Sequence, residues 1–588
     1  MKRILIFAFL FGILAVSYYA FALSIAVSIS YSGYHEELSR EELHIPNVEF
    51  SVDFGYTLDK EKRATIVKYL GDDTEIEIPD TLNGYEVVAI GEMAFYNCRK
   101  LMSITASEDN QYFTSIDGIL YDKQLTTLMV LPHTFSGQYT LPDSVTSLGA
   151  HSMPSDMYPD SRFGNSFSLL PSGLTAFSEC KKLTAINVSP NHPKFVSMDG
   201  ILFSKDKTEL IAYPPAKSGA YIVPSHVKVI GYGAFAGCTG LTSLIIQKGV
   251  TAISDRAFLR CVSLTSVIIP NSVTYIGKYA FSNCEVVHSI IIPNSVKKID
   301  KLAFSECFKL ASVLLPSSIK SIEDFTFAGC SSLTNIDIPD SVTSIGNSAF
   351  DRCKNLTTVD VPDSVKGVGS YAFRYCSNLT AVKLPYSLET IKYSTFYGCS
   401  KLPSIAIPKS VTSIEGYAFY GCAGLTSVTI PESVTSIGIG IFSYCSGLLS
   451  ATIPSSVTSI SERAFYECSG LTSVDFPDSV TSIGNNAFSY CSGLTAVTIP
   501  DSVPAIRDGT FLKCTNLTSV TIPDSVGIIG YLAFSGCTSL TSLTIPAFVG
   551  EIAADAFLDC SEDLVLRGEP GSWTEEYASK NNMKFELM

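Results

Sequence analysis

The sequence is poor in the residue patterns on which enzymes and metalloproteins depend. Its 588 residues include one tryptophan and seven histidines, and only 16% of the residues are charged. No G-x-S-x-G, H-E-x-x-H or phosphate-binding glycine loop occurs, and no two cysteines are spaced as C-x-x-C. We therefore expect no enzymatic activity, no catalytic residues, no metal site and no cofactor.

Positive charge is also in deficit. The chain has 41 Lys and Arg against 56 Asp and Glu, a formal net charge of −15. Nucleic-acid binding proteins need a basic surface that neutralises phosphates. We therefore expect no nucleic-acid partner.

Two short stretches resemble metal sites only superficially. His35-Glu36-Glu37 lacks the second histidine of a zinc helix, because position 39 is serine. Asp117 and Asp199 each precede a glycine, but one carboxylate offers too few oxygens for calcium. We interpret the first as a solvated linker and the two aspartates as turn residues.

Long apolar runs are absent except at the amino terminus, where Lys2 and Arg3 precede a run over 4–29. Ala20-Phe21-Ala22 offers a signal-peptide cleavage site after about Ala22, but the run is also long enough to span a bilayer as an anchor. Both alternatives predict export, with the protein secreted or held at the cell surface.

The rest of the chain is dominated by a repeat of 23 residues. Leu264–Cys284 (LTSVIIPNSVTYIGKYAFSNC) and Leu494–Cys514 (LTAVTIPDSVPAIRDGTFLKC) lie ten periods apart and nearly coincide. Cysteine recurs every 23 residues from Cys238 to Cys560, 15 times, always three residues after a phenylalanine. Such a period predicts a solenoid.

The pattern within one unit predicts its path. Val267 and Ile269 alternate with Ser266 and Ile268, as in a short strand with one inward face. Pro270 ends the strand, and later apolar positions, including the phenylalanine and cysteine, complete the core layer. We expect the glycine after the second apolar stretch, Gly277, to permit a tight bend. One unit cannot bury this much apolar surface alone, but stacked units can.

The unit LxxVxIP…VxxIGxxAFxxC resembles the leucine-rich repeat of the BspA-like (LRR-5) type, found in bacterial surface proteins and some protist ones. The resemblance covers roughly 48–588. It implies a repeat solenoid with a parallel β-sheet on the concave face and short strands and irregular segments on the convex face. It also implies adhesion or protein recognition rather than catalysis.

The regions outside the regular array divide the chain further. Asn83-Gly84 is a hairpin signal in an irregular first unit, and Asp-Gly at 117–118 and 199–200 predicts two hairpin insertions. Ser572 is a candidate helix N-cap, followed by a closing strand over 584–587. The predicted units are a signal peptide or membrane anchor (1–30), a linker (31–47), an N-terminal cap with irregular repeats and two insertions (48–220), a regular array of 15 repeats (221–560) and a C-terminal cap (561–588). Residues 151–173 break the pattern as either a decayed repeat or a protruding loop.

All 17 cysteines occupy the repeat position. Exported proteins commonly form disulfides, but pairing neighbouring coils would leave an odd cysteine and strain the repeat. We therefore expect buried, reduced cysteines that behave as small apolar side chains.

The outward strand residues are the candidate binding site. The fifth strand position is aliphatic in the amino-terminal half of the array and then acidic, and we expect it to lie on the concave face: Ile245, Ile268, Ile291, Leu314, Asp337 and Asp360. An exposed aliphatic stripe indicates a binding surface, unless the insertions fold over it. By family resemblance, the predicted function is an exported recognition or adhesion module for extracellular or host-surface proteins; the alternative is a structural spacer without a specific ligand.

Overall fold

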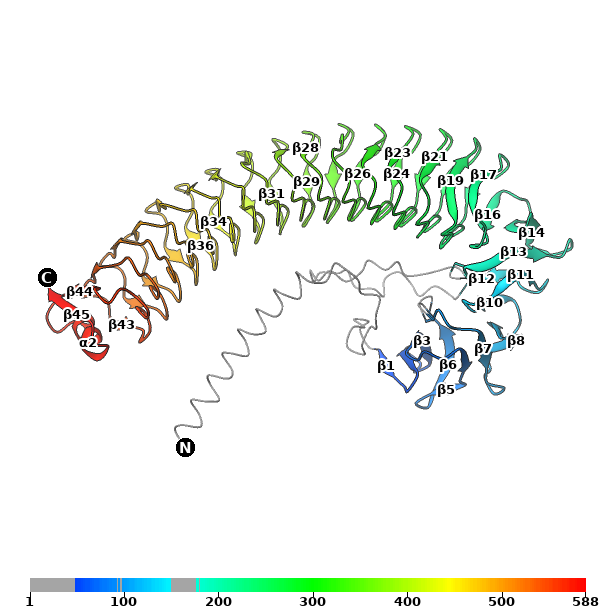
Figure 1. Cartoon of the computed structure of the whole chain (residues 1–588), viewed down its shortest axis with the longest axis horizontal. Helices are drawn as coiled ribbons and strands as arrows, with labels where there is room; N and C mark the ends of the chain where they lie inside the picture. The colour runs from blue at the N-terminus through cyan, green and yellow to red at the C-terminus, as the bar shows by residue number, and fades with distance from the viewer. Residues whose placement is uncertain (1–47, 92–93, 96–97, 150–175, 179) are drawn as a thin grey trace.

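The protein is described here by a computed structural model. It describes residues 48–91, 94–95, 98–149, 176–178 and 180–588. The predicted signal or anchor segment, the linker and the insertion 151–173 lie outside these residues. The described chain forms a solenoid bent into an arc, with irregular amino-terminal units at one end and helix α2 at the other (Figure 1).

The first unit consists of two small sheets that precede the regular coils. Asn83 and Gly84 have φ of 52° and 88° and form the predicted hairpin turn between β5 and β6. The strands of this unit are β1 (Glu49–Phe50), β2 (Phe54–Leu58), β3 (Ala64–Tyr69), β4 (Glu75–Ile78), β5 (Thr81–Leu82), β6 (Tyr85–Ile90) and β7 (Ser103–Ala106).

Two antiparallel hairpins follow at the predicted Asp-Gly pairs. Asp117 and Asp199 both have φ of 52°, and the glycine after each is also left-handed, so both aspartates are turn residues. The strands of this region are β8 (Phe113–Ile116), β9 (Ile119–Asp122), β10 (Thr127–Val130), β11 (Ser136–Leu141), β12 (Ser147–Leu148), β13 (Lys182–Val188), β14 (Phe195–Met198), β15 (Ile201–Ser204) and β16 (Glu209–Ala212).

The regular coils contribute up to two short strand segments, one before and one after the proline turn; the first is not a strand in the coils that contain Ile336, Ile405 and Val474. We call the first set the outgoing strands: β17 (Gly219–Val223), β19 (Leu241–Ile246), β21 (Ser266–Ile268), β23 (Ser289–Ile291), β25 (Ser312–Leu314), β28 (Thr358–Asp360), β30 (Ala381–Lys383), β33 (Ser427–Thr429), β35 (Ser450–Thr452), β38 (Ala496–Thr498), β40 (Ser519–Thr521) and β42 (Ser542–Thr544).

The return strands are two residues each. They are β18 (Val229–Ile230), β20 (Ala252–Ile253), β22 (Tyr275–Ile276), β24 (Lys298–Ile299), β26 (Ser321–Ile322), β27 (Ser344–Ile345), β29 (Gly367–Val368), β31 (Thr390–Ile391), β32 (Ser413–Ile414), β34 (Ser436–Ile437), β36 (Ser459–Ile460), β37 (Ser482–Ile483), β39 (Ala505–Ile506), β41 (Ile528–Ile529) and β43 (Glu551–Ile552). Both sets pair in parallel with a shift of one repeat, as in Leu244↔Val267 and Ile253↔Ile276. The solenoid, its repeat and its parallel strands are confirmed.

A stack of phenylalanine rings runs through the core of the array. From Phe235 to Phe557, all 14 consecutive pairs are stacked, with ring centroids 4.9–5.9 Å apart and interplanar angles of at most 23°. Isolated aromatic pairs prefer offset or edge-to-face contacts. The hydrogen-bonded backbone ladders therefore hold these rings in parallel at the spacing of the coils.

The two ends of the coil cross-section are hydrogen-bonded differently. In the turn segment that carries the phenylalanine, backbone bonds join neighbouring coils directly: Phe258 N–H donates to the Ala280 carbonyl at 2.7 Å, and Phe396 N–H to the Ala418 carbonyl at 2.9 Å. At the proline turn a side chain bridges the coils, as where the Ser364 hydroxyl donates to the Val342 carbonyl at 2.7 Å. The coils are thus closer at the turn segments, which form the inner edge of the arc.

This curvature differs from our expectation that the strand residues line the concave face. In Figure 1 both sets of strands run across the band between its inner and outer edges. The outgoing strands therefore form one flank of the solenoid, which we call the outgoing flank. The strand pattern alone does not reveal which side of the coils forms the inner edge of the arc.

The role of Gly277 also differs from the predicted bend. Its φ is not left-handed, but a Cβ there would lie 2.5 Å from the backbone nitrogen of Asp255 in the preceding coil. The left-handed positions of this coil are instead Tyr279 and Asn283, both with φ of 58°. Glycine at 277 thus serves the close approach of two coils rather than a bend.

The carboxyl end closes the stack with the predicted helix and strand. Helix α2 (Trp573–Lys580) begins at Ser572, whose side chain accepts a hydrogen bond from Glu575 N–H. Tyr577 packs edge-on against Phe557 at 5.7 Å and covers the last ring. Strand β44 (Val565–Gly568) pairs in parallel with β45 (Lys584–Leu587).

Candidate functional site

The outgoing flank carries the aliphatic side chains that the sequence analysis proposed as a site. Along β21, Val267 is buried while Ser266 and Ile268 are exposed, so the alternation of the sequence is present. Outward side chains at the fifth strand position keep large exposed fractions: Ile245 39%, Ile268 59%, Ile291 67% and Leu314 56%. None of these four is covered by the hairpin insertions.

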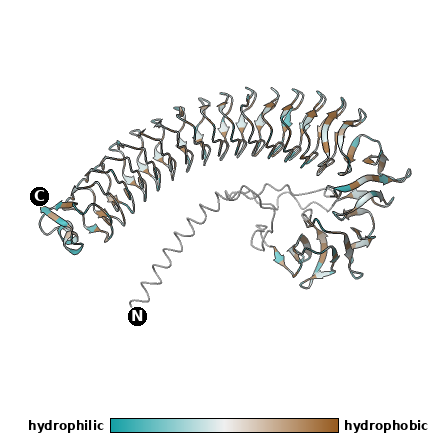
Figure 2. Cartoon of the chain, viewed as in Figure 1, coloured by the Kyte–Doolittle hydropathy of each residue, from teal (hydrophilic) through white to brown (hydrophobic). Residues whose placement is uncertain are grey.

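These side chains form one continuous strip. Strand register places Ile222 beside Ile245, Ile245 beside Ile268, and Ile291 beside Leu314. Ile222 is itself 51% exposed, so the strip begins one coil earlier than the sequence analysis proposed. Neighbouring strands lie about 4.8 Å apart, which makes the five side chains a contiguous apolar surface. We call Ile222, Ile245, Ile268, Ile291 and Leu314 the aliphatic strip; Figure 2 shows the strands at this end of the array as the more hydrophobic ones.

A charged margin follows the strip. Asp337 and Asp360 are exposed in the next two coils, and the bridge between Asn335 and Thr358 sets them in the same register. Lys383 pairs with Asp360, with Nζ 3.1 Å from Oδ1. An ion pair this exposed contributes little stability. The arrangement is an apolar strip that ends in charged groups, as at the core and rim of a protein interface.

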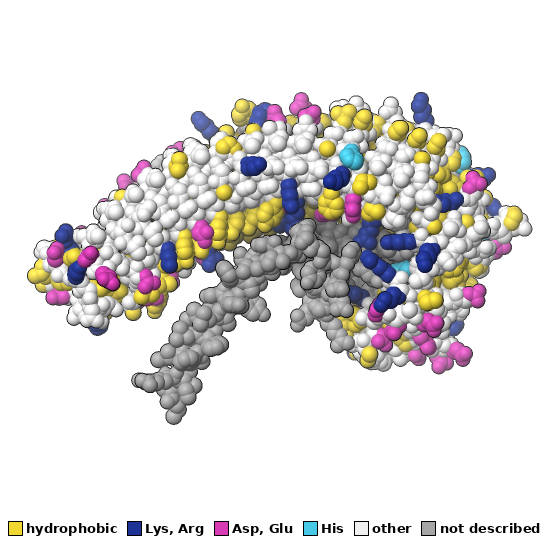
Figure 3. Space-filling model, viewed as in Figure 1, with side chains coloured by type: hydrophobic (Ala, Val, Ile, Leu, Met, Phe, Trp, Pro, Cys, Tyr) yellow, Lys and Arg dark blue, Asp and Glu magenta, His cyan; other side chains and the backbone are white. Residues whose placement is uncertain are grey.

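The inner edge of the arc carries a second feature, which the sequence analysis missed. Six successive coils each place a tyrosine one or two residues before the cysteine; we call this set the tyrosine row: Tyr375, Tyr397, Tyr420, Tyr444, Tyr466 and Tyr490. Consecutive ring centroids are 5.3, 4.4, 4.9, 5.5 and 5.5 Å apart. Figure 3 shows hydrophobic side chains, a class that includes tyrosine, gathered along this edge.

The tyrosine row is only partly buried. Tyr444 and Tyr490 keep 38% and 37% of their surface exposed, and the other four rings are half-buried. Burial, and after it the neighbouring Tyr397 and Tyr444, raises the pKa of Tyr420 well above its ordinary value. The sequence signal that could have revealed the tyrosine row is a tyrosine one or two residues before the cysteine in six consecutive repeats.

The cysteines have a structural role in this arrangement. All 17 are free thiols, and every one from Cys180 to Cys537 is buried, while Cys98 and Cys560 are half-buried. From Cys261 onward, each thiol donates to the phenylalanine carbonyl of the preceding coil, as Cys399 does to Phe373 at 3.3 Å. Burial raises the pKa of these thiols, to about 12 for Cys422 and Cys491. Reactive cysteines need a lowered pKa and access, so these thiols are not suited to catalysis.

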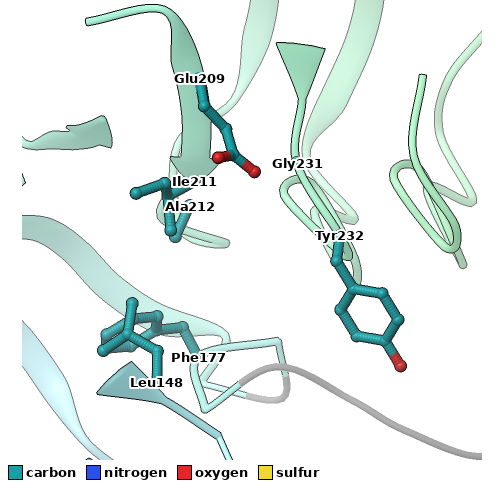
Figure 4. Close-up of a pocket in the computed structure, with 7 residues that line it drawn as sticks. All are labelled: Leu148, Phe177, Glu209, Ile211, Ala212, Gly231 and Tyr232. Atoms are coloured by element: carbon teal, nitrogen blue, oxygen red, sulfur yellow. The ribbon is translucent and has the colours of Figure 1, made fainter. Parts of the chain in front are cut away.

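A small pocket lies where the irregular units meet the regular array (Figure 4). It has a volume of about 160 Å³ and is lined by Leu148, Phe177, Glu209, Ile211, Ala212, Gly231 and Tyr232. Small-molecule sites usually have about 300–1,000 Å³. Burial, and after it Asp206, raises the pKa of Glu209, but no second polar group of the lining converges on that carboxyl.

Among the described residues, no group of three His, Cys, Asp or Glu side chains could hold a metal ion. Within the same part of the chain, no helix is both long and apolar enough to cross a membrane.

A family model described as the BspA type leucine rich repeat region matches residues 72–130, 217–334, 320–449 and 437–562. No curated protein sequence matches the chain significantly.

Several solved structures are similar. A leucine-rich repeat protein from Bacteroides ovatus is 26% identical, covering 67% of this chain and 98% of that chain, with a TM-score of 0.49. A leucine rich cell surface protein from Faecalibacterium prausnitzii is 23% identical, covering 81% and 94%, with a TM-score of 0.32. The pneumococcal vaccine antigen PcpA is 17% identical, covering 67% and 96%, with a TM-score of 0.37.

Proposed function

Because the chain belongs to the BspA-type leucine-rich repeat family, we propose that it is an exported, non-catalytic recognition module that binds extracellular or host-surface proteins. Its contact surface is the aliphatic strip of the outgoing flank together with the charged margin at Asp337 and Asp360. The amino-terminal sequence, with its basic residues before an apolar run, supports secretion or display at the cell surface.

The exposure of the strip is the observation that carries this proposal. A soluble protein gains nothing in stability from five neighbouring aliphatic side chains that face solvent, and contiguous apolar patches usually mark binding sites. Interfaces concentrate their free energy in such apolar anchors, surrounded by a polar rim that excludes water. Later coils present Thr429, Thr452, Thr498 and Thr521 at the same strand position and lack these anchors.

The experiment compares two paired variants of the full chain in a pull-down of extracellular proteins. In the first, Ile268→Ser and Ile291→Ser remove the centre of the strip. In the second, Thr498→Ala and Thr521→Ala alter the equivalent position of later coils and serve as the matched control. We expect the affinity of the first variant for the captured protein to be at least about tenfold lower than that of the wild type. The control should bind this protein as the wild type does.

Both pairs of side chains point outward, so neither variant should lower the free energy of unfolding by more than about 0.5 kcal/mol per site. A folded isoleucine variant that captures the same protein with unchanged affinity would show that the strip is not the contact surface. Failure of the wild type to capture any protein would favour a structural spacer without a specific ligand.

A further inference from the structure

The tyrosine row on the inner edge of the arc has no role in the recognition function proposed above. We propose that it binds an extended, uncharged polysaccharide of β-linked pyranose sugars, laid along the concave edge of the solenoid. This site lies at the turn segments, whereas the aliphatic strip lies on the outgoing strands, so the two sites involve different residues and different partners.

The core of the array does not depend on the tyrosine row. The phenylalanine stack already fills the interior, and Phe373, Phe396, Phe419, Phe442 and Phe465 are each fully buried. The tyrosines lie beside this stack in the sequence but keep part of their rings in solvent. A repeat position that only shields the core can be filled by glycine, asparagine or lysine, as the residue before the cysteine is in other coils.

The spacing of the rings distinguishes between polymers. The row repeats every 4.4 to 5.5 Å over six coils, which is close to the advance of one sugar along an extended β-linked chain. An extended peptide presents side chains to one face about every 6.6–6.8 Å. A polyproline helix repeats after about 9.3 Å. The repeat distance of a polypeptide therefore does not match the spacing of the rings, whereas that of a β-linked glycan does.

The chemistry of the edge also fits a neutral, hydroxyl-rich ligand. Tyrosine combines an apolar ring with a hydroxyl group that donates and accepts hydrogen bonds. Both arginines in these turn segments are already paired: Arg374 with the buried Asp351 at 2.6 Å, and Arg463 with Glu462 at 3.6 Å. A single-stranded nucleic acid would also stack on aromatic rings but needs a positively charged groove, and this chain has a net charge of −15.

Calorimetric titration of the full chain with cellohexaose, xylohexaose and mannohexaose tests the proposal, because a hexasaccharide matches the six rings. We expect at least one of these sugars to bind, with an affinity that changes by less than about twofold between about 0.05 and 0.5 M salt, since no ion pairs form. In the variant Tyr420→Ser, Tyr444→Ser, Tyr466→Ser, affinity should fall by at least about tenfold.

Three comparisons make the result decisive. Replacement of the same residues by phenylalanine keeps the rings and should retain most of the affinity, while the variant Ile268→Ser, Ile291→Ser should bind sugar as the wild type does. If the triple serine variant does not fold, Tyr444→Ser alone should lower affinity by about threefold. The proposal is overturned if no hexasaccharide binds, if folded serine variants bind normally, or if only an oligoproline peptide or an oligonucleotide binds.

Discussion

The phenylalanine stack allows a sharp test of how this solenoid is stabilised. Phe396 lies at the middle of the stack, is fully buried, and has Phe373 and Phe419 as ring neighbours, each 5.6 Å away. Its backbone N–H also donates to the Ala418 carbonyl in the inner ladder. The variant Phe396→Ala removes the ring and leaves the backbone in place, so it isolates the contribution of the ring to two coil interfaces.

The expected loss follows from burial and from the two ring contacts. Replacing a buried phenylalanine by alanine costs about 3–5 kcal/mol because apolar contacts are lost and a cavity remains. Each aromatic contact contributes a further 0.5–1.5 kcal/mol or so. Neighbouring coils are held by continuous ladders that resist collapse into the cavity. We therefore expect a loss in the upper part of the range, about 4–5 kcal/mol.

The measurement is amide hydrogen exchange, since an array stabilised by nearest-neighbour contacts loses stability locally. Protection of amides in the coils that contain Phe373, Phe396 and Phe419 should fall by about a thousandfold, with little change near Phe557. The matched control is Phe548→Ala, because Phe548 is 74% exposed and its loss should change stability by less than about 0.5 kcal/mol. Equal protection in Phe396→Ala and wild type would refute the view that the stack stabilises the coils.

Two further predictions concern charge. Asp351→Ala leaves the Arg374 guanidinium, which its carboxylate contacts at 2.6 Å, largely buried without a carboxylate partner, so the free energy of unfolding in urea should fall by about 3–5 kcal/mol. The exposed pair of Asp360 with Lys383 is the control, and Asp360→Ala should lower the free energy of unfolding by less than about 1 kcal/mol. Burial raises the pKa of Cys422 to about 12 from 9.0, so the folded state holds the thiol proton more tightly than the unfolded state does. The stability that comes from this difference should be complete below pH 9 and should be lost as the pH rises toward 12. A melting temperature that stays constant across this pH range would contradict the raised thiol pKa.

The aliphatic strip shows how far the sequence determines a surface. The period of two in Ser266-Val267-Ile268-Ile269 was sufficient to predict which side chains face out, because strand geometry is local. The fixed repeat placed Ile268 beside Ile245 of the preceding coil. Whether the hairpins at Asp117 and Asp199 cover the strip was an open question in the sequence, and among the described residues the strip is exposed.

The tyrosine row shows the opposite case. Tyr397 and Tyr420 stand two residues before the cysteine, whereas Tyr444 stands one residue before it. Their shift in register obscures the row in the sequence, but the tight turn segments bring the rings to within 5.5 Å of one another. Only the path of the backbone through left-handed residues such as Tyr417 and Tyr444, with φ of 57° and 61°, brings these positions together.

By itself the sequence determined the solenoid, the inward positions, the free cysteines, the hairpins and the closing helix after Ser572, because each follows from a local pattern repeated at a constant spacing. The direction of curvature was decided only by the tertiary structure. A repeated local pattern does not fix how 15 stacked coils bend, because the bend depends on how whole coils pack on one another. In Figure 1 the strands run across the band between its inner and outer edges, so they lie on a flank rather than on the concave face.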